Sequence, residues 1–238
     1  MKNGGITPRL LCAAGFVRRG AVFADIGTDH AYLPLFLLKE GIISRAVCSD
    51  VNEGPLASAK RNAKAAGLSD RCEFVLCDGA AELSGRGITD CAVCGMGGEL
   101  IADIIGRAPW LYSADVRLIL QPMSRQGVLR KFLLSEGFSI MREGYSYDSG
   151  RYYLCIEACY TGQRREIDTV SAEIGEENTD IVNKSAQIDY LKAKRASYIR
   201  EVNGKAKGGA NDEIASKILL AIEEKISFLK KETESDDR

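Results

Sequence analysis

Short apolar runs alternate with helical patterns from residue 22 to about residue 160. The β-rich runs are the predicted strands, at Val22–Asp25, Ala46–Asp50, Glu73–Cys77, Asp90–Cys94, Arg117–Leu120, Phe138–Arg142 and Tyr152–Cys159. The predicted helical stretches lie between them, at Ala31–Glu40, Pro55–Ala66, a short turn near Ala80–Leu83, Glu99–Arg107 and Gln126–Glu136. Strands that alternate with helices predict a parallel sheet with right-handed crossovers and helices on both faces.

The last two predicted strands are joined differently. Only the short link 143–151, which contains Gly150, separates them, so we expect an antiparallel hairpin at one edge of the sheet. Five β/α units followed by a hairpin resemble the Rossmann-like fold of class I methyltransferases rather than a plain dinucleotide-binding fold. The predicted fold class is therefore α/β, with a seven-stranded, mostly parallel sheet.

The pattern changes after Gly162, where aromatic residues become rarer and charge density rises. Apolar residues then recur at heptad spacing in two stretches: Ile181, Ile188, Leu191, Tyr198 and Val202 in the first, and Ala215, Leu219, Ile222, Ile226 and Leu229 in the second. The glycine-containing segment 203–209 predicts a loop between them, and a frayed tail is expected over 231–238. We expect a coiled-coil-like helical hairpin, and divide the chain into domains 1–162 and 163–238.

Composition narrows the functional classes only slightly. With 45% apolar and 27% charged residues, the 238-residue chain has the profile of a globular protein. The 32 Lys and Arg residues nearly balance the 33 Asp and Glu residues, so total charge does not suggest a nucleic-acid partner. No uncharged run reaches ten residues, which excludes a membrane span. The apolar run Leu10–Val17 is followed at once by Arg18 and Arg19, which does not fit a signal peptide, and a cytoplasmic protein is expected.

The eight cysteines do not predict a metal site. Only Cys91 and Cys94 have the spacing of a zinc knuckle, and in a strand these positions point to opposite faces. We therefore expect reduced, largely buried thiols and no bound metal.

The most informative motif is Asp25-Ile-Gly27-Thr28-Asp29, which leads from the first strand into a helix. Gly27 permits a tight turn close to a ligand. A dinucleotide fingerprint would place its second glycine where Asp29 stands, and an acid there would repel a pyrophosphate. A carboxylate suits the ammonium or sulfonium group of S-adenosylmethionine, so this cofactor is favoured over NAD. An N-cap role for Asp29 is the alternative.

Two further acids follow the next strands. Asp50, followed by Val51, ends the second strand, where a carboxylate can accept both ribose hydroxyls; the alternative is a helix N-cap. Asp78-Gly79 ends the third, where an acid can accept the adenine amino group and glycine leaves room for the ring; the alternative is a plain turn. Because ligands of open α/β sheets bind beyond the strand ends, the three acids together favour a cofactor pocket.

The fourth strand ends in the glycine-rich strip Gly95-Met96-Gly97-Gly98. Enzymes that methylate exocyclic amines typically carry Asn/Asp-Pro-Pro-Tyr/Phe at this place, and that tetrad is missing here. The strip lets the backbone approach a cofactor and a flat base, which favours attack by a ring nitrogen. A simple strand-to-helix turn is the alternative.

Three motifs together resemble the TrmK family of bacterial tRNA (adenine(22)-N(1))-methyltransferases. They are Asp-Ile-Gly-Thr-Asp-His-Ala-Tyr-Leu-Pro at 25–34, Gly-Met-Gly-Gly at 95–98 and Leu-Gln-Pro at 120–122. The resemblance implies a class I methyltransferase domain with a C-terminal coiled-coil-like domain, S-adenosylmethionine as donor and a tRNA adenosine as acceptor. Thr28 stands where serine is more common in the family, which keeps the hydroxyl.

This chemistry suggests catalytic candidates. Adenine becomes cationic when N1 is methylated, so Asp29 is the candidate for stabilising the developing charge. His30 and Tyr32 are candidates for holding the base, and Arg9 for a phosphate or base contact. The alternatives are that His30 caps the helix and Tyr32 packs in the core.

The balanced total charge conceals two basic segments. Residues 1–24 contain four cations and no acid, and residues 184–207 contain seven cations and two acids. We expect the second segment to contact tRNA through Lys192, Lys194 and Arg200. A solvated helix face is the alternative. A monomer is the favoured oligomeric state. Other open functions are a small-molecule or protein methyltransferase, a non-catalytic RNA-binding module and, least favoured, an NAD-dependent oxidoreductase.

Overall fold

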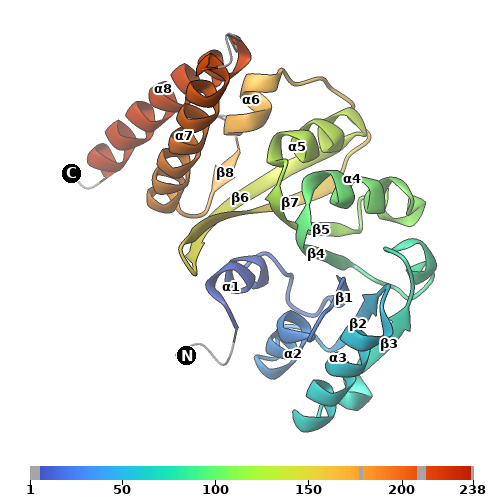
Figure 1. The fold of residues 1–238 in the computed structure, drawn as a ribbon. Coiled ribbons are helices and arrows are strands. Elements are labelled where there is room, and N and C mark those ends of the chain that lie inside the picture. Colours follow the sequence, from blue (N-terminus) through green and yellow to red (C-terminus); the bar gives the residue numbers. More distant parts are fainter. Residues whose placement is uncertain (1–5, 177–178, 208–212, 237–238) are drawn as a thin grey trace.

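The computed structural model describes residues 6–176, 179–207 and 213–236. Within these ranges one sheet has the strand order β3-β2-β1-β4-β5-β7-β6-β8 (Figure 1). Its strands are β1 (Val22–Ile26), β2 (Arg45–Asp50), β3 (Cys72–Leu76), β4 (Asp90–Gly97), β5 (Arg117–Ser124), β6 (Phe138–Asp148), β7 (Arg151–Tyr160) and β8 (Asp180–Ile181). The α-helices are α1 (Pro8–Ala14), α2 (Tyr32–Lys39), α3 (Glu53–Ala65), α4 (Gly98–Gly106), α5 (Gln126–Ser135), α6 (Thr169–Ile174), α7 (Lys184–Lys207) and α8 (Glu213–Asp236).

The seven predicted strands and the crossover helices are confirmed. Strands β1 to β5 run parallel, β7 pairs antiparallel with β5, and β6 pairs antiparallel with β7. The hairpin strands are longer than predicted, so that only Ser149 and Gly150 remain as the turn. The eighth strand was not predicted. Ile181 belongs to this strand and pairs with Glu143, so its placement in a helical heptad was wrong. Helix α7 begins only after Asn183, whose Oδ1 accepts the N–H of Ala186.

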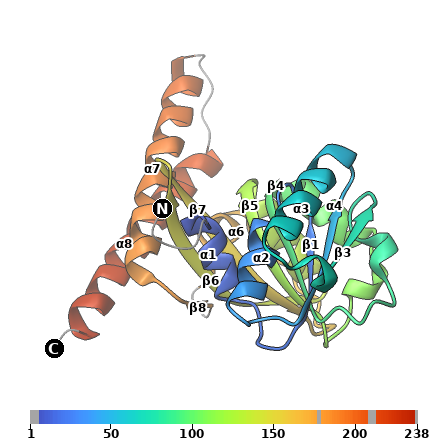
Figure 2. The ribbon, with the colours of Figure 1, turned by 90° about the horizontal axis from the view of Figure 1, so that it is seen from below.

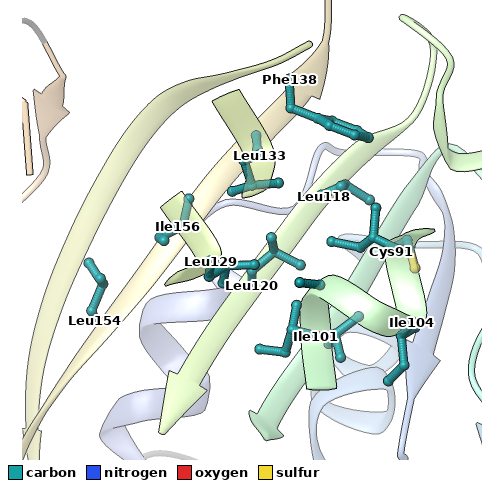
Figure 3. Close-up of a cluster of buried hydrophobic side chains, with 14 of the residues drawn as sticks. Cys91, Ile101, Ile104, Leu118, Leu120, Leu129, Leu133, Phe138, Leu154 and Ile156 are labelled. Atoms are coloured by element: carbon teal, nitrogen blue, oxygen red, sulfur yellow. The ribbon is translucent and has the colours of Figure 1, made fainter. Parts of the chain in front are cut away.

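The two faces of the sheet bury different side chains. Along β4, Cys91 and Val93 face the core shared with α4 and α5, whereas Ala92 faces the core shared with α1, α2 and α3. Figure 3 shows part of the first core, with Ile101, Leu118, Leu129 and Phe138 among its labelled residues. Cys94 packs against the second core, which confirms that Cys91 and Cys94 point to opposite faces. This strict alternation follows from the two-residue period of a strand.

Two helices were not predicted as elements. Proline at the first position starts α1, which packs against the β6–β7 hairpin and against α2. The Asp168 side chain accepts the N–H groups of Val170 and Ser171 and thereby caps α6. Both helices are short, so they carry too few periodic apolar positions to be recognised by pattern alone.

The predicted helical pair lies beyond β6, where α7 and α8 run side by side (Figure 2). Two boundaries were wrong. The segment 203–207 continues α7 instead of forming a loop, and 231–236 continue α8 instead of fraying; residues 208–209 and 237–238 of these predictions lie outside the described residues. One glycine in a helix costs only about 1 kcal/mol, which packing against a neighbouring helix offsets. None of the helices within the described ranges is long and apolar enough to cross a membrane.

A buried ion pair connects these helices to the sheet. The guanidinium of Arg130 in α5 donates to both carboxylate oxygens of Glu143 in β6, at 2.6 and 3.0 Å, and to the Ala172 carbonyl in α6 at 2.7 Å. Tyr145 donates to the same carboxylate at 2.6 Å, and Gln187 in α7 donates to the Tyr145 hydroxyl. Burial favours the neutral acid, but the charge of Arg130 holds the pKa of Glu143 below its ordinary value.

We expect Glu143→Gln to lower the free energy of unfolding by about 3–5 kcal/mol, because Arg130 would stay buried without its counter-ion. Since the pKa is lowered on folding, the stabilisation is present above about pH 4.3 and is lost as the pH falls further. Urea unfolding at pH 7 measures the loss. The exposed pair of Arg164 and Glu136, 3.7 Å apart, gives the control Arg164→Gln, which should cost less than about 1 kcal/mol. Equal losses in the two variants would contradict this account.

Candidate active site

The predicted acids meet at one cavity. It has a volume of about 530 Å³ and lies beyond the carboxyl ends of β1, β2, β3 and β4, with α1 on one side. The predicted site residues that line it are Arg9, Asp25, Gly27, Thr28, Asp29, His30, Tyr32, Asp50, Val51, Asp78, Gly79, Gly95 and Met96. Parallel strands place their carboxyl ends at the same edge, which is why residues so distant in the sequence come together.

The turn after β1 forms the floor of this cavity. The N–H groups of Gly27 and Thr28 both donate to the Ser49 carbonyl in β2, at 2.8 and 2.9 Å. Gly27 has a φ of +73°, which side-chain-bearing residues rarely adopt, so the backbone favours glycine here. A Cβ at this position would also have to displace the flexible end of the Met96 side chain. Asp25 is buried, and the Thr28 hydroxyl donates to its carboxylate at 2.5 Å.

Asp25 is an acid of the site whose charged form is disfavoured. Burial raises its pKa to about 7, the Thr28 hydrogen bond opposes this rise, and the nearby charge of Asp50 adds to it. A cationic group beside Asp25 would restore the charged form, because opposite charges at short range favour ionisation. The floor of the cavity is therefore suited to a ligand that carries positive charge.

Asp50 is held as an acceptor at the end of β2. Its Oδ1 accepts the N–H of Asn52 at 2.8 Å, which fixes the carboxylate in an Asx-type turn. Helix α3 begins after Asn52, which occupies the N-cap position, so the alternative of Asp50 as N-cap is wrong. Val51, which is exposed, lies at the rim.

Asp78 accepts hydrogen bonds that its Asp-Gly motif did not predict. Arg107, at the end of α4, donates to both of its carboxylate oxygens, at 2.8 and 3.3 Å. These hydrogen bonds lower the pKa of Asp78, which therefore stays ionised. Gly79 has a φ of +71° and lies against Ile104, so the backbone bends sharply beneath the cavity wall. Arg107 was missed because no local pattern links the end of a helix to a strand end 29 residues earlier.

Asp29, His30 and Tyr32 stand at the rim with solvent-facing side chains. The Asp29 side chain is 72% exposed, and its Oδ2 lies 3.5 Å from Nε2 of His30. The rings of His30 and Tyr32 are 5.2 Å apart. The N-cap position of α2 belongs to Ala31, with a left-handed φ of 56° and no side-chain cap, and Tyr32 is 51% exposed. Capping by Asp29 or His30 and core packing by Tyr32 are therefore wrong interpretations.

The glycine strip and α1 form the opposite wall. Gly95 has a φ of +81°, and a Cβ there would lie 3.6 Å from the guanidinium of Arg9. Arg9 in turn donates to Oε1 of Gln121 at 3.0 Å, and Gln121 is fully buried in β5. Gly97 does not line the cavity, because the chain there turns into α4 and Gly97 occupies its N-cap position.

The three residues predicted to contact tRNA lie on α7, away from this cavity, and differ from one another. Lys192 is exposed and pairs with Asp189 at 2.8 Å. Lys194 is only 10% exposed and pairs with Glu173 of α6 at 2.6 Å, so it fastens α7 to α6. Arg200 is exposed. The basic segment predicted from the sequence thus contains both an anchored cation, Lys194, and solvent-facing ones, Lys192 and Arg200.

The cavity also contains residues that the sequence did not single out, namely Thr7, Leu10, Ser49, Asn52, Cys77, Cys94, Leu100 and Ile104. Most are apolar or small, and most adjoin a predicted site residue in the sequence. That proximity was the one signal from which they could have been found. Among the residues that the structure describes, no group of three or more His, Cys, Asp or Glu side chains is arranged to hold a metal ion.

The sheet order with its terminal hairpin and the acids at successive strand ends define a class I methyltransferase fold. A family model described as "Methyltransferase domain" matches residues 6–156. The tRNA (adenine(22)-N(1))-methyltransferase of Bacillus subtilis (strain 168) is 32% identical over 171 residues, 71% of each chain. The chain therefore belongs to the tRNA (adenine(22)-N(1))-methyltransferase family.

Solved structures agree over nearly the whole chain. A Streptococcus pneumoniae protein assigned as a tRNA (m1A22) methyltransferase, in complex with S-adenosyl-L-methionine, matches with a TM-score of 0.79 and 28% identity. The match covers 93% of this chain and 99% of that one. A Streptococcus agalactiae protein of the NADB-Rossmann superfamily matches with a TM-score of 0.80 and 27% identity, over 94% and 99% of the two chains.

The raised pKa of Asp25 predicts a pH-dependent stability. Folding raises this pKa to about 7, so the free energy of unfolding should fall as the pH rises from about 4 to about 7. Asp25→Asn removes this penalty and keeps an acceptor for Thr28. Its free energy of unfolding should therefore exceed that of the wild type by up to about 4 kcal/mol at pH 8 and should equal it at pH 4. Denaturant unfolding at both pH values measures the difference. The exposed Asp70→Asn serves as control, and a gain that does not depend on pH would contradict the prediction.

Proposed function

We propose that this protein transfers the methyl group of S-adenosylmethionine to N1 of adenosine 22 in tRNA. The observation that carries the proposal is the single cavity in which buried and exposed acids from successive strand ends meet the rim residues Asp29, His30 and Tyr32. The family to which the chain belongs supports the same reaction. Action on tRNA would place the protein in the cytoplasm.

The residues of the floor and walls fit the cofactor. Asp25, with Thr28 and Gly27, would hold the cationic amino-acid part, and Asp50, next to Val51, would accept the ribose hydroxyls. Asp78 and Gly79 would receive the adenine, with Arg107 sharing the Asp78 carboxylate. Gly95 and Met96 would form the wall between cofactor and base, while Gly97 serves as the N-cap of α4. Bound S-adenosylmethionine supplies an electrophilic methyl group.

The rim residues would act on the base. Adenine N1 already carries a lone pair, so no residue has to remove a proton before the N–C bond forms. The methylated ring is cationic, and the Asp29 carboxylate would stabilise this charge as it develops. His30 and Tyr32, whose rings face each other at 5.2 Å, would hold the adenine by stacking or hydrogen bonding. Alignment of N1 with the methyl group would supply much of the remaining acceleration.

The C-terminal segment would add contacts to the rest of the tRNA. We infer that the C-terminal segment 163–238, which joins the sheet through β8, contacts tRNA through the exposed Lys192 and Arg200 on α7, with Arg9 beside the cavity. Lys194 would contribute indirectly, because its ion pair with Glu173 holds α7 against α6.

Methyl transfer from labelled S-adenosylmethionine to unmodified tRNA at low salt tests the proposed function. Label should appear as 1-methyladenosine, and a tRNA in which adenosine 22 is replaced by guanosine should accept none. Label at another nucleoside would contradict the proposal. Transfer to a small molecule or protein with no transfer to tRNA would support the alternative class of methyltransferase.

Asp29→Asn should lower kcat by about 100-fold or more while it leaves the affinity for S-adenosylmethionine nearly unchanged, because the carboxylate acts on charge that exists only after bond formation begins. Single-turnover transfer and calorimetric donor binding measure the two quantities. Leu100→Ala, on the same cavity wall but apolar, is the control and should affect binding more than kcat. Parallel losses of donor affinity and kcat in Asp29→Asn would make Asp29 a cofactor ligand instead.

A further inference from the structure

A second cavity, also of about 530 Å³, lies between the turn of the β6–β7 hairpin, the beginning of α5, and α7. The residues that matter for its chemistry are Arg125, Arg151, Tyr152, Glu173, Lys194 and Tyr198. None of them belongs to the first cavity, and the proposed reaction uses none of them at the reacting atoms.

The topology places this second cavity at the same edge of the sheet as the active site. Because β7 runs antiparallel to β5, with Leu120 opposite Ile156, the start of β7 lies beside the carboxyl end of β5. The hairpin turn at 149–150 therefore projects beyond the edge where the first cavity lies. Helix α1, which contributes Arg9 to the first cavity, packs against the same hairpin. A chain that crosses this edge would meet both cavities.

The second cavity combines aromatic faces with cations. Tyr152 is half-buried, and its ring lies 4.8 Å from that of Tyr147 on the neighbouring strand, which fixes its orientation. Tyr198, also half-buried, contributes a second ring from α7. Arg151 is exposed on the hairpin. Arg125 is 68% exposed and lies 3.7 Å from Glu99, a long and solvent-exposed pairing that costs little to break.

Two acids line the second cavity, Glu173 and Glu201, and the charge of the first is compensated. Glu173 is held by Lys194 at 2.6 Å, and the charge of Lys194 keeps the pKa of Glu173 low although burial works in the opposite direction. The two side chains form a compensated pair that shapes the wall. The exposed charges that line the cavity are those of Arg125, Arg151 and Glu201, two cations and one acid.

We propose that the second cavity binds an unpaired nucleotide of the tRNA close in sequence to the target adenosine. Its base stacks on Tyr152 and Tyr198, and the flanking phosphates contact Arg125 and Arg151. Aromatic platforms bordered by arginines are how proteins hold single-stranded nucleotides, since every base has a face that stacks. The proposal rests on the proposed function, because it assumes that the nucleic acid is tRNA. Holding the neighbouring nucleotide would help to keep the target adenosine extruded.

Tyr152→Ala and Arg151→Glu test the proposal in the full-length protein. Each should raise KM for tRNA, or the dissociation constant of the complex, about tenfold while leaving donor affinity and kcat at saturating tRNA within twofold. Arg151→Glu should also flatten the salt dependence of binding by about one unit of slope. Tyr152→Phe keeps the ring and should behave as wild type. Arg45→Glu reverses an exposed charge at the start of β2, at the edge of the sheet opposite both cavities, and should leave KM unchanged.

The outcomes separate this proposal from the proposed function. Unchanged KM and tRNA affinity in both Tyr152→Ala and Arg151→Glu, or an equal effect in Arg45→Glu, would overturn the nucleotide site. If the wild type transfers no methyl group to tRNA, the proposed function fails, and direct tRNA binding by the same variants still decides the second cavity. Donor binding that matches the wild type shows that each variant is folded.

Discussion

The position of the second cavity relative to the first depends on the buried ion pair between Arg130 and Glu143. One guanidinium joins α5, β6 and the carbonyl end of α6, while Tyr145 and Gln187 extend the network to α7. A buried charge that loses its partner is costly, so these four elements have one favourable relative arrangement. The wall of the second cavity, which α6 and α7 build, is thereby fixed relative to the hairpin and to the edge of the sheet where the first cavity lies.

Three acids follow successive strands at the active-site cavity, and their surroundings give them different protonation and hydrogen-bonding properties. Asp25 is buried under the turn and has a raised pKa, whereas Asp50 is fixed by a backbone N–H and Asp78 is kept ionised by Arg107. The graded environment matches a cofactor with a cationic end and a neutral, hydrogen-bonding end. Asp29, on the exposed side, is the acid that we propose acts on the substrate.

Much of the fold and of the cavity could be predicted from the sequence, because both follow from local patterns. Alternating apolar runs gave the seven long strands, and carboxyl-end acids on parallel strands necessarily converge. What escaped prediction depends on contacts between distant segments. Three such contacts leave no periodic pattern in the sequence: Arg107 with Asp78, Lys194 with Glu173, and β8 with β6. The continuation of α7 through Gly204 likewise departs from what its glycine alone predicts.

The central claim is that the acid-lined cavity serves methylation of one adenosine in tRNA. Nucleoside mass spectrometry of tRNA from cells that lack this protein tests it most directly, with the same cells carrying the wild-type gene or Asp29→Asn for comparison. The account predicts that 1-methyladenosine at position 22 disappears in the deletion, returns with the wild type and does not return with Asp29→Asn. An unchanged level of 1-methyladenosine at position 22 in the deletion would contradict it.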